Sequence, residues 1–153
     1  MCRLGLVAAL ALSGSKAWAF DPMLPDPKLT PGRIAASSAE SRDGVTAAMT
    51  AEVFKRYRIP VDRRGAYKID HLIPKELGGA DEIENLWPQK IQARPYTARR
   101  KQVLTHTLRE LVANGKLTLA DAQAEIREDW ISSFIVHIGM VYLEPGAKHR
   151  ASE

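Results

Sequence analysis

The stretch AYKIDHLIPKELGGADEIENLWPQ, residues 66–89, most constrains the fold, because it contains two short runs of strand-forming residues separated by glycines. The first run, AYKIDHLIP, is rich in β-forming residues and ends at Pro74. The second run, ENLWPQ, follows the Gly78-Gly79 pair, and Pro88 is expected to end it. We therefore expect a two-stranded hairpin. An isolated hairpin is only marginally stable, so it should pack on the helix that follows.

Three helices are expected around this hairpin. Apolar residues at helical spacing predict a helix over about 45–57, which Pro60 ends, and a second over about 97–114. Thr118 and Asp121 form a capping arrangement at the start of a third helix. The stripe of this third helix that is expected to pack in the core comprises Leu119, Ala122, Ile126, Trp130 and Phe134. The sequence thus predicts a small α+β domain.

Residues 1–19 have the layout of a secretory signal, with Arg3 before an apolar run and small residues ahead of a cut at Phe20. The apolar run is shorter than the ~20 residues that span a bilayer, so we expect export to the periplasm or beyond and no membrane span. The mature chain is expected to comprise an extended proline-rich arm and linker at 20–44, laid over the domain or loose in solvent, a folded domain at 45–143 and a flexible tail at 144–153.

The net charge of the chain does not by itself indicate a partner, so evidence for a nucleic-acid partner has to come from clusters of basic residues. Loss of Arg3 and Lys16 with the leader lowers the formal net charge from +4 to +2, which is too small to indicate a nucleic-acid partner. The only cysteine of the sequence, Cys2, lies in the leader, so the mature chain has no thiolate for a metal site. A basic segment without an intervening acid either contacts phosphates or is a solvated turn. Its members are Lys90, Arg94, Arg99, Arg100 and Lys101.

Asp70, His71 and Asn85 form a set that makes chemical sense together. Histidine exchanges a proton near neutral pH, so His71 could act as a general base. The carboxylate of Asp70 is a hard oxygen ligand that suits Mg²⁺ or a similar divalent ion. Asn85 could hydrogen-bond an imidazole nitrogen and so orient the ring. These are the parts needed for metal-assisted hydrolysis of a phosphodiester, although Asp70 and His71 could also be a structural hydrogen-bonded pair.

The pattern DHLIPKELGG followed by NLWPQ resembles the HNH endonuclease family, and in particular its small secreted members. This resemblance implies a ββα-metal finger with His71 as general base, Asp70 as metal ligand and Asn85 as the residue that orients His71. It also implies a divalent ion, Mg²⁺ or Mn²⁺, and a nucleic-acid substrate, with DNA favoured over RNA.

The resemblance leaves one ligand position without a match. HNH proteins usually supply a third residue, histidine or asparagine, from the helix after the second strand. The residues of this chain that fall in that region are Thr97, Gln102, Thr105 and, nearly three turns into the helix, His106. Two alternatives therefore stay open: a nucleic-acid-binding module that does not cut, and a structural protein of the cell envelope that uses the same finger as a scaffold. The oligomeric state also stays open.

Overall fold

The computed structural model describes residues 24–36 and 44–139 of the 153-residue chain. The predicted signal peptide, residues 1–19, and the predicted tail, residues 144–153, lie outside the described residues. None of the helices formed by the described residues is both long and apolar enough to cross a bilayer.

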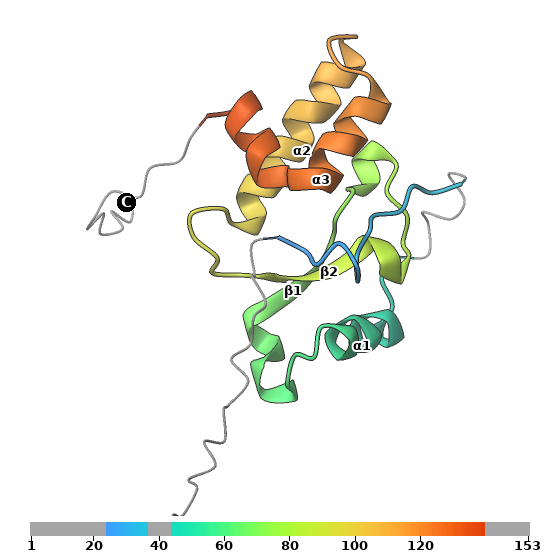
Figure 1. Ribbon diagram of the computed structural model, residues 1–153, viewed down its shortest axis with the longest axis vertical. Coiled ribbons are helices and arrows are strands. Elements are labelled where there is room, and N and C mark those ends of the chain that lie inside the picture. The colour runs from blue at the N-terminus through green and yellow to red at the C-terminus, as the bar shows by residue number, and fades with distance from the viewer. Residues whose placement is uncertain (1–23, 37–43, 140–153) are drawn as a thin grey trace, which may run out of the picture.

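The described chain forms a small α+β domain in which one hairpin lies between helix α1 and the helix pair α2 and α3 (Figure 1). Three short 3₁₀ helices join the larger elements, over Val61–Ala66, Lys75–Leu77 and Ile83–Asn85. The expected three α-helices and the expected hairpin are confirmed, close to the predicted bounds. The observed bounds are α1 Ala47–Arg56, β1 Tyr67–His71, β2 Leu86–Lys90, α2 Ala98–Ala113 and α3 Leu119–His137.

The hairpin is antiparallel, with Asp70 of β1 opposite Trp87 of β2. Strand β2 continues through Pro88 to Lys90, so the prediction that Pro88 ends the strand is wrong. Pro88 lies opposite Ile69 at a position where the hairpin forms no ladder hydrogen bond. Its nitrogen therefore faces the open edge of the two-stranded sheet, where the missing N–H interrupts nothing.

Helix α3 begins as its capping residues predict. The Thr118 hydroxyl accepts a hydrogen bond from the Asp121 N–H at 3.0 Å. Leu119 is 45% exposed, so its predicted place in the core is wrong; it is the first residue of α3 and precedes the first buried turn. The other four residues of the stripe pack with α2 in one core cluster that includes Leu104, Leu108, Ala122, Ile126, Trp130 and Phe134.

A second core cluster joins α1 to the hairpin, and the proline-rich arm closes over it. Its buried members are Val53, Phe54, Tyr57, Ile59, Leu72, Leu86 and Trp87. Thr30 of the arm is fully buried; its hydroxyl lies 2.7 Å from the Tyr57 hydroxyl and donates to the Leu86 carbonyl at 2.9 Å. Ile34 pairs with Gly79 in the loop between the strands. Residues 24–36 of the arm are therefore laid over the domain, one of the two arrangements expected.

Candidate active site

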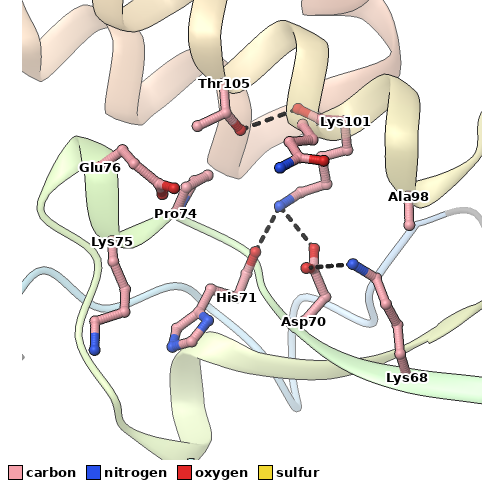
Figure 2. Close-up of a pocket in the computed structure, with 10 residues that line it drawn as sticks. Lys68, Asp70, His71, Pro74, Lys75, Glu76, Ala98, Lys101 and Thr105 are labelled. Atoms are coloured by element: carbon pink, nitrogen blue, oxygen red, sulfur yellow. Dashed lines mark hydrogen bonds and ion pairs between the residues drawn. The ribbon is translucent and has the colours of Figure 1, made fainter. Parts of the chain in front are cut away.

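A cavity of about 290 Å³ opens between the end of β1 and the first half of α2 (Figure 2). Asp70 and His71 are adjacent in sequence, yet both line this cavity, because β1 ends at His71 and the strict alternation of strand side chains ends with it. Three lysines and two acids leave one positive charge in the lining when the imidazole is neutral. The polar lining residues are Lys68, Asp70, His71, Lys75, Glu76, Lys101, Gln102 and Thr105.

His71 is held by a carboxylate from the loop between the strands. Nε2 of His71 lies 2.6 Å from Oδ1 of Asp81. The other oxygen of Asp81 accepts hydrogen bonds from Lys75 Nζ at 2.6 Å and from the Gly44 N–H at 3.1 Å. The Asp81 side chain is only 4% exposed, so this group is a buried, well-satisfied anion.

The ionisation of Asp81 decides which nitrogen of His71 carries the proton of the neutral ring. Burial acts to raise the pKa of Asp81, but the hydrogen bonds from Lys75 and His71 outweigh it and hold the pKa below its ordinary value. An ionised carboxylate only accepts hydrogen bonds, so Nε2 of His71 carries the proton that it shares with Asp81. Nδ1 is thereby left as the acceptor nitrogen of the neutral ring.

Sequence reasoning did not identify Asp81 as a candidate site residue. It stands ten positions after His71 and directly follows the Gly78-Gly79-Ala80 turn. Gly79 lets the chain turn back there: a Cβ on this residue would lie 1.8 Å from the Ile73 carbonyl oxygen. An acid immediately after such a turn was the available signal.

Asp70 is paired with two lysines. Its Oδ2 lies 2.9 Å from Lys101 Nζ and its Oδ1 lies 3.2 Å from Lys68 Nζ. Burial acts to raise the pKa of Asp70, but the charges of Lys101 and Lys68 outweigh it and hold the pKa below its ordinary value. Lys101 also donates to the His71 carbonyl at 2.5 Å, as Figure 2 shows. The ammonium group of Lys101 therefore ties α2 to the end of β1.

The surroundings of Asp70 do not fit the divalent ion that the resemblance implies. Both oxygens of its carboxylate accept from ammonium groups, and Lys101 places a cation where the metal would have to bind. Across residues 24–36 and 44–139 no group of three or more His, Cys, Asp or Glu side chains is arranged to hold a metal. No catalytic step is therefore assigned to an ion at this site.

Asn85 is fully buried and braces the loop between the strands. Its Nδ2 donates to the carbonyls of Ile73 and Ala80, each at 2.9 Å. Its Oδ1 accepts from the N–H groups of Ile73 at 3.0 Å and Arg33 at 3.4 Å. These four bonds use the whole capacity of an amide side chain. The predicted contact between Asn85 and the imidazole is therefore replaced by Asp81, and Asn85 positions the loop that carries Asp81.

The predicted basic surface is smaller than expected. Arg94 and Arg99 are exposed and Lys90 is half-buried. Arg100 is half-buried, and its guanidinium donates to the Pro95 carbonyl. Lys101 is only 3% exposed, so its predicted place on this surface is wrong; its partner is Asp70. The remaining cations flank the β2–α2 connection, next to the cavity that Lys101 lines.

Of the four candidates for a third ligand, Gln102 and Thr105 line the cavity, and Thr97 and His106 do not. Thr97 is the N-cap of α2, and Thr105 is buried with its hydroxyl donating to the Lys101 carbonyl at 3.0 Å. His106 is 61% exposed and lies 3.5 Å from Glu110, its neighbour one turn along the helix.

The Asp81 pair is expected to make stability depend on pH. The pKa of the Asp81 carboxyl in the folded protein lies below its ordinary value of about 3.9. The ionised carboxylate therefore contributes its full stabilisation above that value, and this stabilisation is lost as the pH falls through the folded pKa. The free energy of unfolding of the wild type should therefore fall more steeply below about pH 4 than that of Asp81→Asn. Urea titrations at several pH values measure this. A constant difference between the two proteins from acid to neutral pH would contradict the prediction.

Searches of known proteins found no matching family model, no matching curated protein and no matching solved structure.

Proposed function

We propose that the protein hydrolyses phosphodiester bonds in nucleic acid, with His71 as the general base. The observation that carries the proposal is the buried Asp81 carboxylate 2.6 Å from Nε2 of His71. A carboxylate that holds one nitrogen of an imidazole leaves the other free to take a proton from a nucleophile. His71 lines a cavity of about 290 Å³, in which water and a phosphate group would meet the imidazole.

The charge of the site supports a phosphate as substrate. Three lysines line the cavity, the exposed Arg94 lies on the segment that leads into α2, and the exposed Arg99 lies in the first turn of that helix. Basic side chains around a cleft bind the nucleic-acid backbone without regard to sequence. The resemblance to HNH endonucleases favours DNA over RNA, and the leader-like residues 1–19 support action outside the cytoplasm.

The order of elements supports an HNH-like finger as part of this proposal. The hairpin β1–β2 is followed by α2, and the Asp70-His71 pair stands at the end of the first strand. Lys101 of α2 contacts both Asp70 and the His71 backbone, so the helix completes the site. The same finger without cleavage remains the second candidate, because none of Thr97, Gln102, Thr105 and His106 matches the third ligand that the family usually supplies from this helix.

The proposal is tested by incubating the purified protein with supercoiled plasmid and with a labelled RNA, in Mg²⁺, in Mn²⁺ and in excess EDTA. Conversion of plasmid to the nicked form in at least one condition is the expected result. Binding to DNA without cleavage in every condition would favour the binding module. Neither binding nor cleavage of either nucleic acid would favour the structural role in the cell envelope.

A further inference from the structure

We infer that the ammonium group of Lys101 supplies the fixed positive charge at the reacting phosphate, so that cleavage needs no divalent ion. This inference rests on the proposed function. It concerns which group neutralises the phosphoryl oxygens, and the structure offers a protein side chain for that task.

Lys101 is placed as a built-in cation. Lysine is almost never fully buried unless it is paired, and Lys101 is 3% exposed with Nζ 2.9 Å from Oδ2 of Asp70. It belongs to the first turn of α2, where the helix dipole disfavours a cation. The ion pair with Asp70 offsets this cost. The ion pair also accounts for the burial of Lys101, which solvation at the surface would not.

Lys101 is also held next to the base. Its Nζ donates to the carbonyl of His71 at 2.5 Å, so one residue provides both the imidazole and an anchor for the cation (Figure 2). An ammonium has three donors, and these two bonds use two of them. The third can be offered to a phosphate oxygen, because Lys101 forms part of the cavity wall.

The chemical step balances with these groups alone. The oxygen of a water molecule forms a bond to phosphorus while the bond from phosphorus to the leaving sugar oxygen breaks. Nδ1 of His71 takes the proton of the attacking water, and the leaving oxygen takes a proton from solvent. The third N–H of Lys101 stabilises the charge on a non-bridging oxygen, which a preorganised donor does without reorganisation.

The wild type provides the first test. Plasmid nicking is expected to proceed in excess EDTA at the rate measured in Mg²⁺. The melting temperature is expected to stay unchanged on addition of Mn²⁺, because an ion that binds the folded state would raise it.

Lys101→Asn provides the second test, since it removes the cation and leaves the Asp70 carboxylate open to a metal. In EDTA its nicking rate should fall by about 10²-fold or more. Mn²⁺ should restore part of that rate and should now raise the melting temperature. Lys55→Ala is the matched control: Lys55 lies on α1 outside the lining of the cavity, pairs with Glu52 and is 80% exposed, so this variant should keep nicking in EDTA. If Lys101→Asn does not fold, the wild-type measurements decide.

The outcomes separate the two proposals. Cleavage by the wild type only with a divalent ion would overturn the role of Lys101 and leave the proposed function intact. Cleavage in EDTA by Lys101→Asn at the wild-type rate would also overturn it. Absence of cleavage by the wild type in every condition would overturn both.

Discussion

His71→Ala is expected to lower the rate of plasmid nicking by about 10²–10⁴-fold, the usual contribution of a general base. The imidazole is the group at the cavity that can take a proton from water at neutral pH, and Asp81 holds it in the tautomer with Nδ1 as acceptor. Binding to DNA should change little, because the substitution removes none of the lysine and arginine side chains around the cavity. Nicking rates and binding curves measured on the same preparation test both statements.

His106→Ala is the matched control for this substitution. His106 is 61% exposed and lies against Glu110, away from the lining of the cavity. Its removal should leave the nicking rate at the wild-type value. If the two variants lost the same fraction of the nicking rate, the loss could not be attributed to the position of His71. An unchanged rate in His71→Ala would remove His71 from the mechanism.

Asn85→Ala is expected to destabilise the fold by about 3 kcal/mol or more. The substitution leaves the carbonyls of Ile73 and Ala80 and the N–H of Ile73 without their partner in a fully buried position. Each buried polar group left unsatisfied costs ~1–3 kcal/mol. Urea unfolding followed by circular dichroism measures the loss.

Asn114→Ala is the control for the stability measurement. Asn114 follows α2 and its side chain is exposed, so its removal should change the free energy of unfolding by no more than ~0.5 kcal/mol. The Asn85 variant should also lose nicking activity, because the loop that it braces carries Asp81. A stable Asn85→Ala protein would mean that water replaces the amide, and the bracing role would then be wrong.

Local sequence signals predicted most of the secondary structure. The spacing of apolar residues located the three helices, and the Thr118–Asp121 pair located the start of α3. The glycine pair between two strand-forming runs predicted the hairpin. These signals work because helix periods, caps and turns depend on residues within a few positions of each other. They failed at Pro88, because whether the N–H of a strand residue is needed for the ladder depends on its register with the partner strand.

The sequence also singled out two residues at the end of β1, Asp70 and His71. Asp70 and His71 do line one cavity. The partners of these two residues were not predicted. Asp81 is ten residues from His71, and Lys101 is 31 residues from Asp70, so neither contact follows from a local pattern.

The sequence by itself determined the α-helices and strands, their order, and the position of Asp70 and His71 at the end of β1. The tertiary structure alone decided what each charge contacts. Lysine is usually exposed, so Lys101 reads as a surface cation until α2 packs on β1 and brings its ammonium to Asp70. Asn85 reads as a partner of His71 until the path of the loop commits its amide to backbone groups. The physical reason is that a buried polar group takes whichever partner the packing places within about 3 Å, and packing joins segments that are distant in the chain.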